Sequence, residues 1–162
     1  MKIPFNPELD LELIRETPVS PALLWRCWTD TALLKQWFCP KPWEVTQVEL
    51  ELRPGGKFHT LMRGPGEDGQ IIEPPSEPGC VLAVEQERLL VFTDALGPDY
   101  RPKADAFMTA FVTFEPLPNG GTRYRAVACH PTVEKRQQHE AMGFEPGWGA
   151  AFEQLVELAS TL

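Results

Sequence analysis

Hydrophobic and polar residues alternate along much of the chain. In residues 9–17 three leucines alternate with acidic side chains, and this period of two predicts a β-strand with one buried face. The alternation returns after residue 45 and predicts six further strands, over residues 45–52, 58–63, 80–86, 88–95, 107–117 and 122–130. An Asn119-Gly120 pair between the last two is a strong signal for a tight hairpin turn.

Helical spacing appears in two places, between the first two strands and after the last one. Ser20 followed by Pro21 predicts the start of a short helix over residues 21–29, and Thr29 or Asp30 can cap a second over residues 31–38. Near the end, Thr132 can cap a short helix over residues 133–142.

A long final helix is predicted from Pro146 to the end of the chain, because Gly143 ends the helix before it. Apolar residues recur along it at intervals of 3, 4 and 7, which predicts one buried stripe. The stripe consists of Trp148, Ala151, Phe152, Leu155, Ala159 and Leu162.

Glycine and proline gather in three segments between the strands. The sequence RPGG at 53–56 could belong to a phosphate-binding loop, but such a loop opens a helix. Here a strand follows Lys57, so a turn or bulge in a hairpin is favoured. Residues 63–79 and 96–105 are interpreted as long hairpin loops.

This order of elements predicts an α+β fold in one domain spanning residues 1–162, with an ordered core over about 9–160. A seven-stranded antiparallel sheet would cover its apolar face with the final helix. Because one helix cannot fill a strongly twisted sheet near both ends, a cavity between them is expected.

The composition of the chain limits the functions, locations and cofactors that can be expected. A net charge of −8 disfavours nucleic-acid binding, and no apolar run approaches the roughly 18 residues that a membrane helix needs. The N-terminus lacks the apolar segment of a secretory signal, so a cytoplasmic protein is expected. The four cysteines are far apart without a C-x-x-C pair, which favours reduced core thiols and predicts neither a metal nor another cofactor.

Four segments carry a resemblance to a known family: LRPGGKF, ERLLVFTDAL, VTFEPLPNGGTRYRA and HPTVEKRQQHEAMGFEPGWGAAFEQL. Over about residues 9–160 the chain resembles the START and Bet v 1-like (SRPBCC) superfamily, in the branch related to activators of the heat-shock protein 90 ATPase. The resemblance implies a helix-grip fold, in which the sheet wraps around the last helix. It leaves the activity open, because this superfamily includes lipid carriers, cyclases, hydrolases and co-chaperone domains.

Three functions follow as hypotheses. The leading one is binding of a small apolar or amphipathic molecule by a monomer or homodimer, with no catalysis. A co-chaperone role is the second, and a chaperone is the less favoured partner because the chain has no room before Leu9 for the separate docking domain of the eukaryotic activators. The third is a polyketide cyclase-like or hydrolase-like enzyme that uses His130 or Asp94 as its catalytic group.

The predicted cavity would be lined from the strands and from the final helix. Met62 and Met108 would supply adaptable walls for loosely specified apolar ligands. The full set of expected lining residues is Trp37, Phe58, Met62, Phe92, Met108, Tyr124, His130, Trp148, Phe152 and Leu155.

The histidines invite other interpretations. His130 could be a polar anchor in the cavity or a cap before the short helix. A thiol–imidazole pair with Cys129 is rejected because neighbouring strand residues point to opposite faces. His139 and Glu140 show no zinc-binding spacing and are expected on a solvated helix face.

Overall fold

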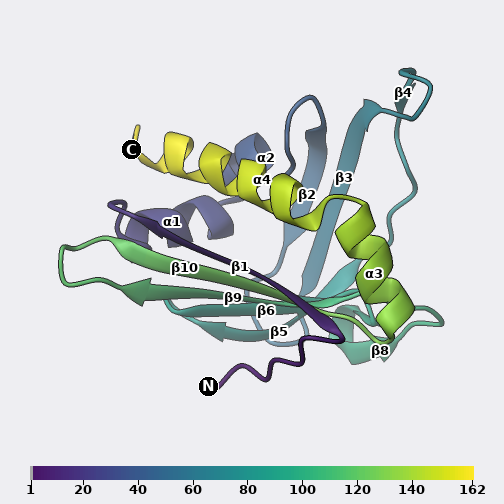
Figure 1. The fold of residues 1–162 in the computed structure, drawn as a ribbon, viewed down its shortest axis with the longest axis horizontal. Coiled ribbons are helices and arrows are strands. Elements are labelled where there is room, and N and C mark those ends of the chain that lie inside the picture. The colour runs from purple at the N-terminus through teal and green to yellow at the C-terminus, as the bar shows by residue number, and fades with distance from the viewer. Residues whose placement is uncertain (1) are drawn as a thin grey trace.

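A computed structural model describes residues 2–162 (Figure 1). A curled antiparallel sheet forms a half-barrel, and the C-terminal helix α4 lies across its open side. The α+β helix-grip fold predicted from the sequence is confirmed. Seven strands follow one path: β1 (Asp10–Thr17), β10 (Thr122–Cys129), β9 (Thr109–Pro116), β6 (Leu89–Thr93), β5 (Gly79–Glu85), β3 (Lys57–Pro65) and β2 (Glu44–Leu50).

The first and last strands of the sequence are neighbours in the sheet. β1 pairs antiparallel with β10 over its full length, from Asp10 opposite Cys129 to Thr17 opposite Thr122. This register places Leu11 and Leu13 on the buried face and leaves Glu12 on the outer one, where its carboxylate accepts from Arg125 Nε at 2.6 Å. The alternating leucines of the sequence therefore form part of the core, as predicted.

Two short helices separate β1 from β2, as the sequence predicts. Helix α1 (Pro21–Thr29) is capped by the Ser20 hydroxyl, which accepts from Leu23 N, and α2 (Thr31–Trp37) by the Asp30 carboxylate. Their apolar faces join the core, where Trp28 packs edge-on against Trp37 with ring centroids 4.9 Å apart.

The two segments interpreted as loops contain short strands. β4 (Ile71–Ile72) pairs with the end of β3, and β7 (Leu96–Gly97) pairs with β8 (Arg101–Pro102) around a single 3-10 turn. These additions stay outside the seven-strand path, so the predicted architecture is unchanged.

The RPGG segment is a hairpin corner between β2 and β3. Gly55 has φ +80°, and a Cβ on Gly56 would lie 2.1 Å from the Glu51 carbonyl oxygen. Both positions therefore require glycine for the backbone path, and the structural interpretation of this segment is correct.

The chain after β10 forms α3 (Val133–Ala141) and then α4 (Phe144–Ala159). The predicted start of the last helix at Pro146 is two residues late, because Gly143 turns the chain with φ +93° and the helix begins directly after it. This adds Phe144, 3% exposed, to the buried face of α4.

Candidate functional site

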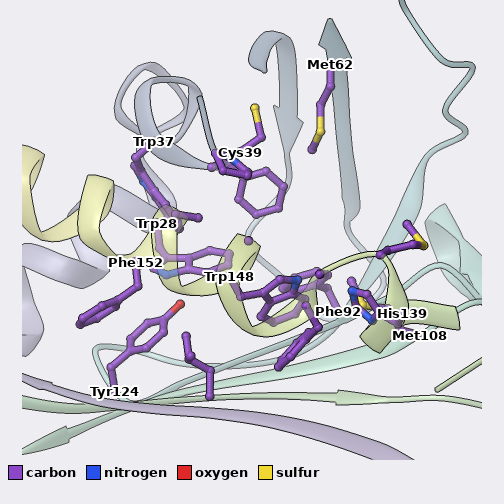
Figure 2. A pocket seen from close by; sticks show the side chains of 18 residues that line it. Trp28, Trp37, Cys39, Met62, Phe92, Met108, Tyr124, His139, Trp148 and Phe152 are labelled. Atoms are coloured by element: carbon purple, nitrogen blue, oxygen red, sulfur yellow. The ribbon is translucent and has the colours of Figure 1, made fainter. Parts of the chain in front are cut away.

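A cavity of about 420 Å³ lies between the half-barrel, the two short helices and the first half of α4 (Figure 2). Its size falls within the roughly 300–1,000 Å³ of typical small-molecule sites. The exposed side chain of Met142 lies at its rim, beside Gly143 and Gly147 at the start of α4. The cavity therefore opens next to the corner between α3 and α4.

Aromatic rings make most of the wall. Trp28 and Trp37 come from the short helices, Phe92 from the sheet, and Trp148 and Phe152 from α4. The Phe152 ring also leans on Tyr124 of β10, with centroids 4.9 Å apart. These rings come from the short helices, the sheet and α4, and each is held by its packing in the core. The cavity therefore has a preformed apolar wall.

Helix α4 is held over the cavity by the side chain of Gln154. Its Nε2 donates to the carbonyl oxygens of Trp37 at 3.0 Å and Cys39 at 2.8 Å, and its Oε1 accepts from Lys41 N at 3.0 Å. One amide thus connects α4 to the segment that follows α2. The Cys39 thiol at this junction lines the cavity, and burial raises its pKa to about 11, so it stays protonated.

A pair of histidines lies near the mouth of the cavity, and His139 is the member that lines it. His130 Nδ1 lies 2.8 Å from the carbonyl oxygen of Leu9, and His130 Nε2 lies 2.8 Å from His139 Nδ1. A carbonyl oxygen only accepts, so His130 carries its proton on Nδ1. With both rings neutral, His130 Nε2 accepts from His139 Nδ1–H, and His139 Nε2 keeps a free lone pair.

His139 is not on a solvated helix face, and that prediction is wrong. The ring is 7% exposed and packs against Phe107, Phe144 and Trp148, with centroids 5.0 to 5.8 Å away. Burial, and to a smaller extent the neighbouring His130, lowers the pKa of His139 to about 4. At neutral pH the imidazole with which α3 lines the cavity is therefore uncharged.

Trp28 presents an unusual polar atom to the interior. Its indole Nε1 is fully buried, with no partner of ordinary hydrogen-bond geometry among residues 2–162. Burial raises the pKa of Tyr124, and the Trp28 side chain, within reach of the Tyr124 hydroxyl, opposes part of that rise. The Tyr124 side chain, 4% exposed, directs its hydroxyl toward Trp28 (Figure 2). Both residues line the cavity.

Seven of the ten residues expected in the cavity line it. These are Trp37, Met62, Phe92, Met108, Tyr124, Trp148 and Phe152. Phe58 lies one layer behind, stacked on Phe92 at 4.4 Å, and Leu155 is fully buried further along α4. His130 is also one side chain away, since His139 stands between it and the cavity. Whether the lining residues hold a ligand stays a prediction.

Neither weak catalytic candidate faces the cavity. Asp94 Oδ1 accepts from the backbone N–H groups of Phe107 at 2.8 Å and Met108 at 3.1 Å, which orders the loop before β9. His130 has both ring nitrogens in hydrogen bonds, as described above. Both side chains thus make hydrogen bonds that order the backbone or a neighbouring side chain. Within the described residues they do not converge on a common point where a substrate atom could react.

Other expectations can be compared with the described residues. All four cysteines are free thiols, three of them buried. Within residues 2–162 no three His, Cys, Asp or Glu side chains converge on a metal position. Over the same range, none of the helices combines the length and the apolar character needed to cross a membrane.

Several lining residues were missed from the sequence. Trp28 and Phe144 line the cavity but are not among the lining residues expected from the sequence. The helical spacing of Leu24, Cys27 and Trp28 predicts only that Trp28 is buried. That its indole borders an open volume depends on where α4 crosses, which no local pattern contains.

Comparison with known proteins places the chain among relatives of the same fold. A protein of Nitrosomonas europaea of known crystal structure is 43% identical, with a TM-score of 0.87 over 97% of each chain. A Mycobacterium smegmatis protein is 27% identical, with a TM-score of 0.74 over 93% of this chain and 90% of its own. One from Arthrobacter aurescens is 26% identical, with a TM-score of 0.75 over 96% and 88%. A search among curated proteins gave no match.

The family assignment comes from the sequence itself. Residues 18–160 match the model of the family described as activator of Hsp90 ATPase homolog 1-like protein. This range includes both short helices, every strand of the sheet path except β1, and all of α3 and α4. The chain therefore belongs to the Activator of Hsp90 ATPase homolog 1-like family, within the superfamily that the sequence resembles.

Proposed function

We propose that the protein binds a small hydrophobic or amphipathic molecule in the cavity between the sheet and α4. The observation that carries the proposal is the preformed cavity of about 420 Å³ walled by aromatic and aliphatic side chains. An apolar guest would remove these rings from water, and burial of apolar area is worth about 25 cal/mol per Å².

The geometry favours binding over catalysis. The polar groups at the cavity are few and spread apart, with His139 near the mouth and Tyr124 on the opposite wall (Figure 2). A nucleophile next to a general base, or two converging carboxylates, would indicate an enzyme, and the lining of the described cavity holds neither. A carrier, sensor or storage role needs only shape and a few orienting polar groups.

The test is a titration with a fluorescent apolar probe, followed by quenching of tryptophan emission. Trp28, Trp37 and Trp148 line the cavity and would report occupancy directly. We expect saturable binding with a dissociation constant in the micromolar range, about −8 kcal/mol at 1 μM.

A matched pair of variants makes the titration specific for the cavity. Ala151 lines it, whereas Ala150 on the same helix is exposed. Ala151→Phe should fill the cavity and weaken the probe at least tenfold, or about 1.4 kcal/mol, and Ala150→Phe should leave affinity unchanged. No saturable binding to wild type below about 100 μM, or equal loss in both variants, contradicts the proposal.

A chaperone is the second candidate partner, and the printed family description is what favours it. Addition of this protein to the cognate heat-shock ATPase, with hydrolysis measured over a range of concentrations, tests that role. A several-fold stimulation together with a measurable complex would make the co-chaperone function the primary one.

A further inference from the structure

His139 Nε2 is a hydrogen-bond acceptor that no group of the described chain uses. His130 carries its proton on Nδ1, the nitrogen 2.8 Å from the Leu9 carbonyl oxygen, so its Nε2 is the acceptor for His139 Nδ1–H. With both rings neutral, the lone pair of His139 lies on Nε2. The hydrogen bond to His130 is the only one that the His139 ring makes within residues 2–162.

This nitrogen can be reached by another molecule although the ring is buried. Two side-chain nitrogens of the described residues are fully enclosed and lack a partner of ordinary hydrogen-bond geometry, Trp28 Nε1 and Arg136 Nε. His139 Nε2 also lacks a partner but is not one of the enclosed atoms, so part of its surface is accessible. The residue lines the cavity beside Phe144 and Trp148, which places this accessible surface at the cavity.

The position of the acceptor is fixed from several sides. The His139 ring packs against Phe107, Phe144 and Trp148 with centroids 5.0 to 5.8 Å away, and its Nδ1 lies 2.8 Å from His130 Nε2. A side chain that is already held in place loses little conformational entropy when a ligand binds. A donor on a ligand would therefore meet a preorganised acceptor at the end of the cavity where α3 lies (Figure 2).

The charge of the surroundings restricts the donor. An ammonium group could donate to Nε2, but the described lining contains no Asp or Glu, and burial of an unpaired cation is costly. A carboxylate only accepts, and it would face the lone pair of a ring whose pKa is lowered by burial to about 4. A hydroxyl group is uncharged and carries a proton that it can donate.

We infer that His139 Nε2 anchors the hydroxyl group of an alcohol or phenol on an otherwise apolar ligand in the cavity. This hydroxyl anchor rests on the proposed function and specifies its ligand class. The hydroxyl would lie near the mouth, and the apolar remainder of the ligand would pack against the aromatic wall formed by the short helices, the sheet and α4.

Three naphthalene probes, substituted at the same ring position, separate a donor from an acceptor on the ligand. Naphthol carries a hydroxyl group, methoxynaphthalene an ether oxygen that only accepts, and methylnaphthalene neither. Their affinities are measured by isothermal titration at neutral pH, where naphthol is uncharged. Because a hydroxyl is better hydrated in water than a methyl group, the quantity compared between variants is the ratio of each affinity to that of methylnaphthalene.

A variant that keeps an aromatic ring locates the effect. In His139→Phe the naphthol ratio should fall about five- to tenfold below that of wild type, because the bound hydroxyl loses its acceptor. The methoxynaphthalene ratio should stay the same, since an ether has no proton to donate. His59→Phe is the control, because His59 lies on β3 outside the cavity lining, and it should leave both ratios unchanged.

Nitrogen NMR of the wild-type protein tests the same contact without a substitution. Spectra that correlate the ring protons on carbon with the ring nitrogens distinguish the unprotonated Nε2 of His139 from its protonated Nδ1. Naphthol should move the Nε2 resonance in the direction of a nitrogen that accepts a hydrogen bond. Methylnaphthalene should cause only the small change that a nearby aromatic ring produces.

Each ratio compares two affinities of one variant, so a general loss of stability does not imitate the expected result. If His139→Phe does not fold, the NMR measurement on wild type decides. An unchanged naphthol ratio in the folded variant overturns the hydroxyl anchor while leaving the proposed function intact. An Nε2 resonance that naphthol does not move, or an equal fall in the methoxynaphthalene ratio, also overturns it. If none of the three probes binds, the proposed function fails and the hydroxyl anchor fails with it.

Discussion

His139 Nδ1 lies 2.8 Å from His130 Nε2, so two histidines from different elements form a buried pair beside the cavity. His130 is fixed in turn by the Leu9 carbonyl oxygen, which lies 2.8 Å from its Nδ1. The pair joins the beginning of β1, the end of β10 and α3. A proton added to His139 would have to be placed in an aromatic surrounding next to another imidazole.

The first prediction concerns stability in acid. Burial, and secondarily His130, lowers the pKa of His139 from 6.5 to about 4. Between pH 6.5 and about pH 4, His139 is protonated in the unfolded chain but stays neutral in the folded protein. The free energy of unfolding therefore falls as the pH is lowered through this window. The full shift corresponds to about 3 kcal/mol. Above pH 7 the same group should have no effect on the pH dependence.

The measurement is urea unfolding of wild type and His139→Gln between pH 4 and 7. The glutamine can still donate to His130 Nε2 but does not titrate, so its stability should decline less over this window. His59→Gln serves as the control, because His59 lies on β3 away from the pair and contacts the carbonyl oxygen of Ser76. Parallel curves for wild type and His139→Gln would show that His139 titrates normally.

The second prediction concerns Gln154, the side chain that connects α4 to the segment following α2. Gln154→Glu keeps the length of the side chain but removes the N–H donors to the carbonyl oxygens of Trp37 and Cys39. Loss of two donated hydrogen bonds should destabilise the protein by about 1–2 kcal/mol, and repulsion between carboxylate and carbonyl oxygens adds to this. Gln137→Glu, at an exposed position of α3, is the matched control in the same denaturation experiment. An equal, small effect in both variants would mean that α4 is held by its apolar face alone.

Local patterns predict most of this fold. Alternating residues identify strands such as β1 and β9, because one face of each is buried in the core and the other is more exposed. Strand β6 is buried at every position and is identified by its continuous apolar run instead. Capping residues such as Ser20, Asp30 and Thr132 identify three helix starts, and each is observed to accept a backbone N–H. These signals are local in sequence, and so they are readable without a structure.

The site is less predictable, because it depends on contacts between distant elements. Helix α3 has a mostly polar sequence, which suggests a solvated helix, yet its His139 is buried against Trp148 of the next helix. Trp28 borders the cavity together with Tyr124 and Phe152, which come from elements much later in the sequence. Periodicity shows which side chains are buried, and packing decides which of them border a cavity.

The third prediction concerns the glycine-rich corner. Gly55 N donates to the carbonyl oxygen of Val81 at 2.7 Å, and Gly56 N donates to that of Arg53 at 2.9 Å. Neither N–H is free for an anion, whereas phosphate loops leave theirs unpaired. Phosphate or nucleotide at millimolar concentration should therefore leave the amide resonances of Gly55 and Gly56, and the melting temperature, unchanged. Saturable shifts at these two amides would restore the anion-binding interpretation.

The last prediction separates packing from binding on α4. Phe152 is 4% exposed, faces the cavity and leans on Tyr124, so Phe152→Ala removes both core contacts and a piece of cavity wall. The cost to folding should be about 3 kcal/mol, at the low end for such a substitution, because the ring already borders open volume. An apolar probe should also bind about tenfold more weakly, or 1.4 kcal/mol.

Leu155 lies one turn further along α4, fully buried and outside the lining, so Leu155→Ala should cost a similar 2–5 kcal/mol of stability while probe affinity changes little. Probe titration and urea unfolding of wild type, Trp148→Phe and these two variants give both quantities for each protein. If affinity falls equally in Phe152→Ala and Leu155→Ala, binding follows global stability and the apolar stripe of α4 is packing rather than a ligand wall.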